Sequence, residues 1–221
     1  MNTAAEHVQE TFDRGAGGYD LRWARYNLAT HRATVELLEL RGDERVLDIG
    51  CGTGELERHL LCRWPRLRIV AIDLCRQMLA QARTKFSPEL TVRYAIADIE
   101  RLPFPPASFD IVLSCNAFHF AADRMKAIGE VERVLSPGGT SIVTDWCGDY
   151  LFCRLLDGWL HVTGRAPEGR VLRETECRSL LEETRLEVSR LSRYRIGWFW
   201  GMMTAMARKP GCEEASAGTS R

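Results

Sequence analysis

The sequence predicts an α/β fold with a mostly parallel sheet, and three observations support this prediction. Short apolar runs of strand length alternate along the chain with longer segments of helical period. The connections between them are short, which favours parallel strands joined by right-handed crossovers. The apolar run at 46–49 also leads directly into a turn with glycines at alternate positions, Gly50, Gly52 and Gly54.

A helix is expected before that first strand. Residues 1–18 are polar and glycine-containing, so we expect them to form a loose lead-in. Leu28, Val35 and Leu38 then lie on one face of a helix that ends near Leu40. The turn-like residues 41–43 separate this helix from the strand at 46–49.

The segment after the glycine turn repeats the helix–strand alternation. A helix is expected at 55–64, because leucines recur there at helical spacing and a proline follows. A strand at 68–73, a helix at 74–85 and a strand at 90–96 follow. The segment 102–106 is rich in proline, so it forms neither a regular helix nor a central strand.

The next elements complete the parallel part of the sheet. They are a strand at 109–114, an amphipathic helix at 123–135, a turn at 136–139 and a fifth strand at 140–144. Ligands bind at the carboxyl ends of the strands in open α/β sheets. The residues directly after the fourth and fifth strands should therefore face a ligand.

The pattern loosens after residue 146. A long segment between a strand and a helix is more often functional than idle, so we expect 147–173 to form a substrate lid. Its polar candidates are Asp149, Tyr150, His161 and Arg165. The remaining elements are expected to be helices at 150–162 and 175–184, strands at 186–196 and 199–207, and a disordered tail at 209–221.

Composition limits the possible partners. The 221 residues suit one domain, spanning 1–208, and the formal net charge of zero gives no reason to expect a nucleic-acid partner. No run of 18 apolar residues exists and the N-terminal residues are polar, so we expect no membrane partner and a cytoplasmic location. The eight cysteines form no C-x-x-C pair and no zinc spacing, so reduced thiols and no metal site are expected. Composition does not fix the oligomeric state.

The glycine turn indicates a nucleotide-like ligand. Glycine reaches positive φ without steric cost, and the following helix directs free N–H groups at the turn. The dinucleotide fingerprint would need a third glycine at position 55, where this chain has Glu55. Its carboxylate disfavours a pyrophosphate at that helix N-terminus. A nicotinamide-dependent reductase is therefore less favoured than a protein whose ligand has ribose and adenine without phosphate.

Five stretches carry a resemblance to a known family by their order and spacing. They are Val46–Gly54, Ala71–Leu74, Ala97–Ile99, Phe109–Ser114 and Val134–Thr140. Together they resemble the motifs of class I S-adenosylmethionine (SAM)-dependent methyltransferases over residues 17–145. Residues 101–104, ahead of 108–110, are similar to the ubiquinone/menaquinone-methyltransferase-like branch.

The resemblance implies the rest of the fold and the activity. It implies a Rossmann-like three-layer sandwich whose seven-stranded, mostly parallel sheet ends in an antiparallel C-terminal hairpin. It also implies methyl transfer from SAM to a small-molecule acceptor by in-line displacement. The cofactor-binding residues that follow from it are Tyr19, Asp48, Gly50, Cys51, Gly52, Gly54, Asp73, Leu74, Asp98, Ile99 and Asn116.

Some of these residues have simpler alternative roles. Asp73 is implied to hold the ribose hydroxyls, but an aspartate there could also cap the following helix. Asp98 is implied to accept from the adenine amino group, but it could form a turn with its own backbone. Tyr19 is implied to close over the methionine end of the cofactor, and Asn116 to meet that end through its backbone. A surface tyrosine near a helix cap is the alternative for Tyr19.

The sequence predicts the acceptor site less clearly than the cofactor site. A sulfonium donor releases a neutral leaving group, so a base is needed only when the acceptor carries a proton. His119, Asp145 and His161 are the candidate catalytic residues, although a packed loop histidine is the simpler interpretation of His119. Alternatives are a thiol or metalloid methyltransferase that uses the lid cysteines Cys147 and Cys153, and a non-catalytic SAM-binding protein.

Overall fold

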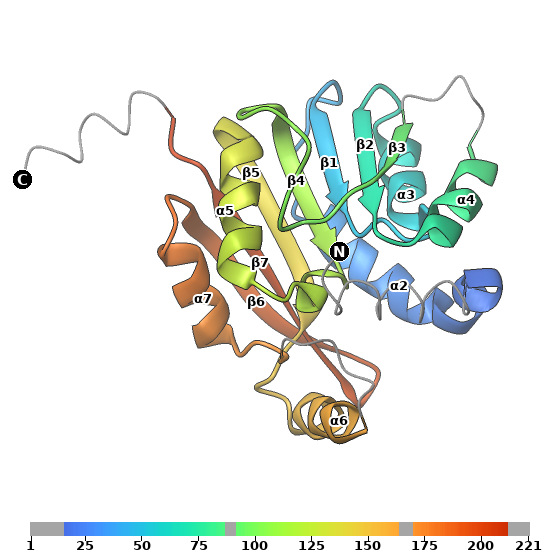
Figure 1. Cartoon of the computed structure of the whole chain (residues 1–221), viewed down its shortest axis with the longest axis vertical. Helices are drawn as coiled ribbons and strands as arrows, with labels where there is room; N and C mark the ends of the chain where they lie inside the picture. Colours follow the sequence, from blue (N-terminus) through green and yellow to red (C-terminus); the bar gives the residue numbers. More distant parts are fainter. Residues whose placement is uncertain (1–15, 87–91, 164–169, 212–221) are drawn as a thin grey trace, which may run out of the picture.

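A seven-stranded sheet forms the middle layer of the molecule (Figure 1). The computed structural model describes residues 16–86, 92–163 and 170–211. The strands lie in the order β3-β2-β1-β4-β5-β7-β6, with β7 antiparallel to both β5 and β6 and the other pairs parallel. The predicted mostly parallel sheet with an antiparallel C-terminal pair is thus confirmed. The strands are β1 (Arg45–Ile49), β2 (Arg68–Asp73), β3 (Val92–Ile96), β4 (Phe109–Cys115), β5 (Leu135–Trp146), β6 (Glu187–Ile196) and β7 (Trp200–Arg208).

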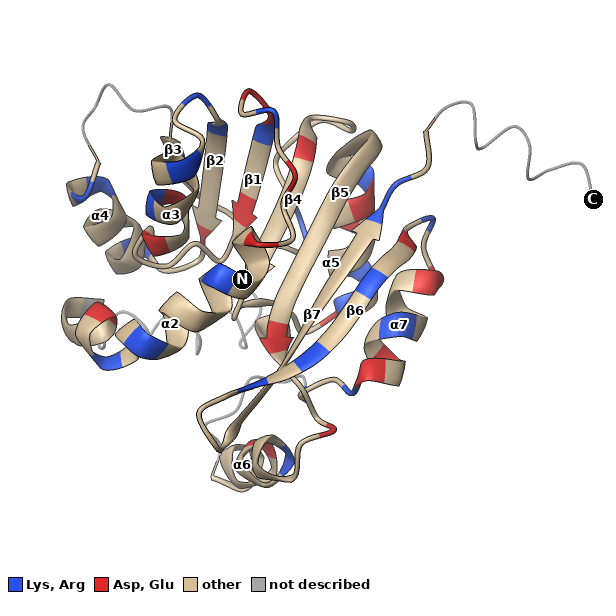
Figure 2. Cartoon of the chain, turned by 180° about the vertical axis from the view of Figure 1, so that it is seen from behind, with Lys and Arg blue, Asp and Glu red and all other residues tan. Residues whose placement is uncertain are grey.

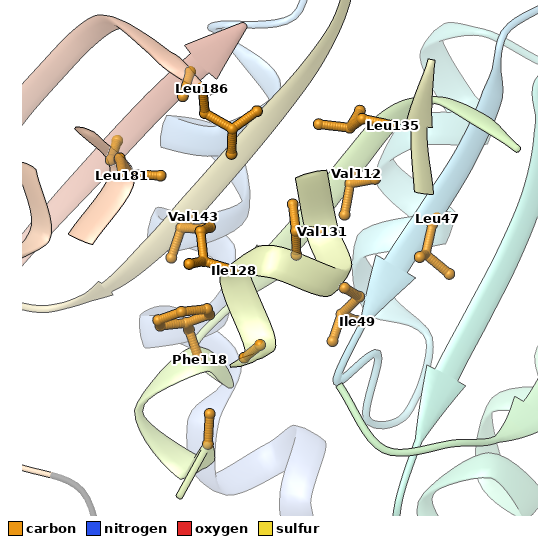
Figure 3. Packing of buried hydrophobic residues seen from close by; sticks show 14 of the residues in the cluster. Leu47, Ile49, Val112, Phe118, Ile128, Val131, Leu135, Val143, Leu181 and Leu186 are labelled. Atoms are coloured by element: carbon orange, nitrogen blue, oxygen red, sulfur yellow. The ribbon is translucent and has the colours of Figure 1, made fainter. Parts of the chain in front are cut away.

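Helices cover both faces of this sheet (Figure 1). Alternation along β1 directs Val46 to the face covered by α2, α3 and α4, and Leu47 and Ile49 to the face covered by α5 and α7. Figure 3 shows the second of these layers, in which Ile128 and Val131 of α5 pack among buried strand side chains. The helices are η1 (Ala16–Gly18), α2 (Tyr19–Val35), α3 (Glu55–Arg63), α4 (Arg76–Thr84), η2 (Phe118–Phe120), α5 (Arg124–Val134), α6 (Leu151–Val162) and α7 (Glu174–Glu182).

Two predicted boundaries were wrong. The first helix ends at Val35 instead of near Leu40, because the N–H groups of Leu37 and Leu38 bond three residues back and tighten the chain into a turn. The predicted turn at 136–139 lies inside β5, which begins at Leu135. There the pairing with β4 shifts its register and Gly138 has a φ of +77°, so the turn is a bulge within the strand.

The C-terminal boundary also differs from its prediction. Lys209 was assigned to a disordered tail, yet its backbone pairs with Gly138 and Gly139 and its Nζ donates to the carbonyls of Glu132 and Leu135. Residues 212–221 lie outside the described residues. In the described ranges, no helix combines the length and apolar character that crossing a membrane requires.

Candidate functional site

The glycine turn after β1 forms one wall of a cavity at the carboxyl ends of the strands. Gly50, Gly52 and Gly54 all have positive φ, at 75°, 54° and 83°. A Cβ on Gly50 would lie 2.2 Å from the Cβ of Ala117, so the loop needs glycine there to pack against the end of β4. A Cβ on Gly52 would meet nothing within 4 Å. The backbone at Gly52 therefore faces open space that a ligand can approach.

The cavity is a partly open hollow with about 930 Å³ of empty space, a volume that includes open solvent at its mouth. Its walls come from the glycine turn, the ends of β2, β3 and β4, and the start of α2. Most of the predicted cofactor residues line it together: Tyr19, Gly50, Gly52, Asp73, Leu74, Asp98, Ile99 and Asn116. Three predicted residues do not line it: Asp48, Cys51 and Gly54.

Gly54 and Cys51 support the turn and do not line the cavity. Gly54 is the N-cap of α3, and a Cβ there would approach the hydroxyl of Tyr94 to 3.0 Å. The Cys51 thiol is buried in the core on the α3 side of the sheet, and burial raises its pKa well above the ordinary value. Both residues therefore shape the turn from behind the cavity.

Asp73 connects the glycine turn to the next loop. Its Oδ2 accepts from the Gly52 N–H at 2.8 Å, and its Oδ1 accepts from the Cys75 N–H at 2.8 Å. The helix-cap alternative was wrong, because the N-cap of α4 is Cys75, whose sulfur accepts from the Met78 N–H. Asp73 is thus held at the cavity wall by two backbone donors.

Asp98 and Tyr19 occupy the predicted wall positions. Asp98 Oδ1 accepts from the Glu100 N–H at 2.9 Å, so the predicted turn alternative is correct while the residue also lines the cavity. Tyr19 begins α2 and packs against Cys75 and Met78. Burial, with a smaller contribution from Asp73, raises the Tyr19 pKa to about 12, so its hydroxyl stays protonated.

Two carboxyl groups are buried behind the glycine turn, Asp48 on β1 and Glu57 on α3. Their exposed fractions are 1% and 0%, and neither forms an ion pair with a cation in the described part of the chain. Burial raises the Asp48 pKa to about 7 and the Glu57 pKa well above its ordinary range, where the Asp48 charge adds to the effect. The pair therefore retains a proton near neutral pH. Glu57 could have been found from the sequence, since it shares a helical face with Leu60 and Leu61.

Glu55 forms ion pairs at the start of α3. Its carboxylate lies 2.6 Å from Arg58 Nη2 and 2.8 Å from Lys85 Nζ. The hydrogen bonds to these cations oppose the effect of burial, and the Glu55 pKa is lowered. An ionised carboxylate at this helix N-terminus agrees with the inference that the ligand there lacks a pyrophosphate.

A histidine–aspartate pair, His119 and Asp145, lines a separate small hollow next to the cavity. Asp145, at the end of β5, accepts from the His119 backbone N–H at 2.8 Å and lies 2.7 Å from His119 Nδ1. A carboxyl oxygen at this distance can accept a hydrogen bond from Nδ1–H, and the tautomer that carries this proton has Nε2 free to accept. The neighbouring Phe120 lines the cavity. Two of the three predicted catalytic candidates are therefore brought together beside the ligand space.

Aromatic rings pack next to this pair, and we call Trp23, Tyr26, His119, Trp146 and Trp200 the aromatic cluster. The His119 and Trp146 rings stack with centroids 5.4 Å apart and an interplanar angle of 11°. Trp146 Nε1 donates to the Tyr26 hydroxyl at 2.7 Å, and Trp200 lies within 6.1 Å of Trp23. These rings come from α2, η2, the end of β5 and the start of β7. Among them, sequence analysis predicted a site role only for His119.

Asn116 links the aromatic cluster to the cavity. Its φ is +60°, its Oδ1 accepts from the Tyr26 hydroxyl at 2.9 Å, and its Nδ2 donates to Thr30 Oγ1 at 2.9 Å. Its backbone N–H already bonds the Thr144 carbonyl, so the predicted backbone contact with a ligand is left to the Asn116 carbonyl. This residue fixes α2 against the end of β4.

The remaining lid candidates lie elsewhere. His161 is on α6, where Nδ1 contacts the Asp157 carbonyl at 2.8 Å, and it lines neither the ligand cavity nor the hollow beside His119. Arg165 lies outside the described residues. Cys147 and Cys153 are buried, and burial raises the pKa of both thiols, that of Cys147 to about 11. Thiols held in the protonated form weaken the thiol or metalloid alternative.

No described group of side chains resembles a metal site. Within residues 16–86, 92–163 and 170–211, no three His, Cys, Asp or Glu side chains are placed to hold one ion. The cysteines in these ranges are all free.

Comparison with known proteins adds to this geometry. Residues 47–143 match a family described as "Methyltransferase domain". A demethylmenaquinone methyltransferase of Thermus thermophilus is 40% identical over 130 residues, which are 58% of this chain and 56% of that protein. A malonyl-[acyl-carrier protein] O-methyltransferase of Serratia marcescens is 32% identical over 185 residues, which are 82% of this chain and 68% of that protein.

A solved structure supports the fold independently. It is the complex between the Haloferax volcanii Trm112 methyltransferase activator and a methyltransferase, which aligns with a TM-score of 0.79 at 21% identity. The alignment covers 90% of this chain and 97% of that one. This chain spans about half the length of several curated relatives that it matches, at 56%, 60% and 50%.

Proposed function

The chain belongs to the class I SAM-dependent methyltransferases, and from this premise we propose that it transfers a methyl group to a small-molecule acceptor. SAM, the methyl donor of the family, would supply the methyl group from its sulfonium: the acceptor atom would bond to the methyl carbon in line with the S–CH3 bond, that bond would break, and the neutral thioether would leave. The observation that carries the proposal is the cavity that brings the glycine turn, Asp73 and Asp98 together with Phe120. Phe120 is the chain neighbour of His119, which pairs with Asp145 in the adjoining hollow.

The cavity residues fit this donor by their chemistry. Open space at Gly52 accommodates a ligand against the backbone, and Asp73 and Asp98 offer carboxylate oxygens that can accept from hydroxyl and amino groups. Tyr19, held neutral by burial, closes the side formed by α2. The ionised Glu55 near the turn disfavours a phosphate-bearing ligand.

His119 is proposed as the group that takes a proton from the acceptor. Asp145 contacts both the backbone N–H and Nδ1 of His119, so it holds the ring with Nε2 available. Stacking on Trp146 restricts the ring further. Correct placement of an acceptor atom supplies a large part of such a rate, on the order of 7–11 kcal/mol, so Asp145 and Trp146 act by positioning. The aromatic cluster favours an acceptor with a flat, apolar body.

The test combines binding and turnover. S-adenosylhomocysteine (SAH) should bind in calorimetry, and labelled methyl groups should move from SAM to one class within a panel of phenols, quinols, amines, carboxylates and thiols. Tight binding of NADH without binding of SAH would overturn the cofactor assignment. Binding of SAH without turnover on any acceptor would favour the non-catalytic alternative. Turnover confined to thiols would favour the thiol alternative.

A further inference from the structure

Helix α6 exposes an apolar face instead of burying it. The exposed fractions are 61% for Leu151, 43% for Phe152, 64% for Leu155, 52% for Trp159 and 89% for Val162. With 3.6 residues per turn, these positions fall within one arc of roughly 100°. A helix of a globular protein normally turns such an arc to the core. We call these five side chains, together with Trp198, the apolar face.

The apolar face continues onto the hairpin between β6 and β7. Trp198 is 81% exposed at the tip, next to Gly197, whose φ is +63°. Phe199, beside it, brings its ring to 5.4 Å from the ring of Phe152 on α6. Figures 1 and 2 place α6 and the hairpin tip at the same edge of the molecule, beyond the carboxyl end of β5.

The charges around this face are cationic. In residues 150–163 and 194–200, the exposed charged side chains are Arg154 and Arg195, while Asp157 is buried. Figure 2 shows α6 as a largely uncharged helix. Asp149 and Glu174, the acids that flank this region, are both ion-paired with Arg193. An apolar surface with a cationic rim complements an interface that is apolar inside and anionic at its boundary.

A series of ring contacts connects the apolar face to the ligand cavity. Phe152 lies 5.8 Å from Trp200, and Trp200 lies 5.1 Å from Trp146. Trp146 stacks on His119 at 5.4 Å, and His119 lies 4.0 Å from Phe120, which lines the cavity. These packed rings make the apolar face and the cavity wall parts of one aromatic arrangement. The exposed Arg154 and Arg195 at the edge of the apolar face favour an anionic lipid surface as its occupant.

We propose that α6 and the Trp198 tip dock this protein on a lipid bilayer that carries anionic headgroups. A shallow amphipathic helix lies in the plane of the interface, with its apolar side about 5–10 Å deep, so no membrane-spanning segment is needed. The sequence-based expectation of no membrane partner considered only spanning segments. The docking does not depend on the proposed methyl transfer. The further idea that an apolar acceptor enters through the aromatic cluster does rest on that proposed function.

Vesicle sedimentation tests the docking without any cofactor or acceptor. The full chain should pellet with vesicles of phosphatidylcholine mixed with phosphatidylglycerol, and less with phosphatidylcholine alone. The double variant Leu155→Ser/Val162→Ser should bind at least about tenfold more weakly to both vesicle types. Arg154→Gln should weaken binding to the anionic vesicles alone, by about fivefold. Met125→Ser removes an exposed side chain from α5 and should leave binding unchanged.

Circular dichroism on each variant shows whether the fold is retained. This control does not require SAH to bind. The proposal is overturned if the wild-type chain does not pellet with anionic vesicles, or if the Leu155→Ser/Val162→Ser variant pellets like wild type. It is also overturned if ultracentrifugation shows a dimer that this double variant dissociates while vesicle binding stays absent. In that case a second copy of the chain covers the apolar face.

Discussion

The glycine-turn side of the ligand cavity and the aromatic cluster are built in different ways. On the glycine-turn side, positions 50–54 and Asp73 are joined by backbone contacts that the chain makes within 23 residues. The aromatic cluster gathers Trp23, His119, Trp146 and Trp200 from four separate elements. The first region depends on backbone shape and the second on side-chain packing between distant segments.

This difference separates the two binding tasks. A backbone turn with fixed φ values can serve one unchanging ligand, while a wall of side chains can be changed without changing the turn. The family relationship fits this division, because the match to the methyltransferase domain covers residues 47–143 and ends before Trp146 and Trp200. The predictions below test whether the two regions are energetically independent.

The largest effect is expected at Gly50. Gly50→Ala places a Cβ 2.2 Å from Ala117 Cβ at a φ of +75°, so the clash and the strain together should lower the free energy of unfolding by about 3–5 kcal/mol. Urea unfolding measures this loss. Gly52→Ala is the matched control, because its Cβ meets no atom within 4 Å.

Gly52→Ala should cost about 1–2 kcal/mol through its positive φ alone, yet abolish SAH binding in calorimetry because the methyl group enters the ligand space. Equal losses of stability in both glycine variants would show that the turn is set by conformation and not by its contact with Ala117. Unchanged SAH affinity in Gly52→Ala would place the ligand elsewhere.

The second effect concerns the His119–Asp145 pair. His119→Gln should lower kcat by about 10²–10⁴-fold for an acceptor that carries a proton, because Nε2 no longer takes it. Asp145→Asn should cause a smaller loss in the same direction by releasing the preferred tautomer. Steady-state kinetics on the acceptor identified by the panel gives kcat, and calorimetry should show SAH affinity unchanged in both variants. A parallel loss of SAH affinity would mean that the pair supports the cofactor side instead.

The sequence predicted the fold and the cavity wall well because their signals are local. The glycine spacing, the acids at strand ends and the apolar runs each occupy a few consecutive residues, and the structure brings Asp73 and Asp98 to one cavity as expected. The bulge at Gly138 was predicted as a turn because the same types of residue occur in turns and in bulges. Short-range patterns therefore carried most of the architecture.

The acceptor side was less predictable for a physical reason. Nothing near Trp200 or Tyr26 in the sequence indicates that β7 and α2 will bring their rings against Trp146. His161 was a reasonable candidate by residue type, but helix geometry directs its Nδ1 to the carbonyl of Asp157, one turn away on α6. Contacts between distant segments depend on the assembled fold, so residue type alone could not select among them.

A third and smaller effect is expected from the buried acid Glu57. Burial raises its pKa in the folded state above the ordinary value of 4.5, so the folded state keeps a proton that the unfolded state loses. The contribution of Glu57 to the free energy of unfolding is therefore fully present below about pH 4.5. It is lost as the pH rises through the pKa that Glu57 has in the folded state. Glu57→Gln removes that penalty and should stabilise the protein by about 1–3 kcal/mol at pH 8.

Thermal unfolding of wild type and Glu57→Gln at a series of pH values measures this gain. The difference between the two should be near zero at pH 4.5 and increase steadily above it. A gain that does not change with pH would mean that Glu57 is destabilising for a reason other than its proton. SAH affinity should change little, since Glu57 does not line the cavity.

The smallest effect probes the join between the two regions. Trp146→Phe keeps a ring that can stack on His119 but removes the Nε1–H that donates to the Tyr26 hydroxyl at 2.7 Å. The hydroxyl still donates to Asn116 Oδ1, so the loss should be about 1 kcal/mol in the free energy of unfolding. Trp198→Phe, at the exposed hairpin tip, is the control and should leave this free energy unchanged.

If the regions are independent, Trp146→Phe should weaken acceptor binding alone. The KM for the acceptor should rise about fivefold, the factor that corresponds to about 1 kcal/mol, and SAH affinity should stay unchanged. Asn116 is the residue through which the change could reach the cofactor side, because it lines the cavity and bonds Tyr26. Equal losses of acceptor and SAH affinity would show that Asn116 transmits the change. The glycine-turn side and the aromatic cluster would then form one coupled site, in which neither wall can vary alone.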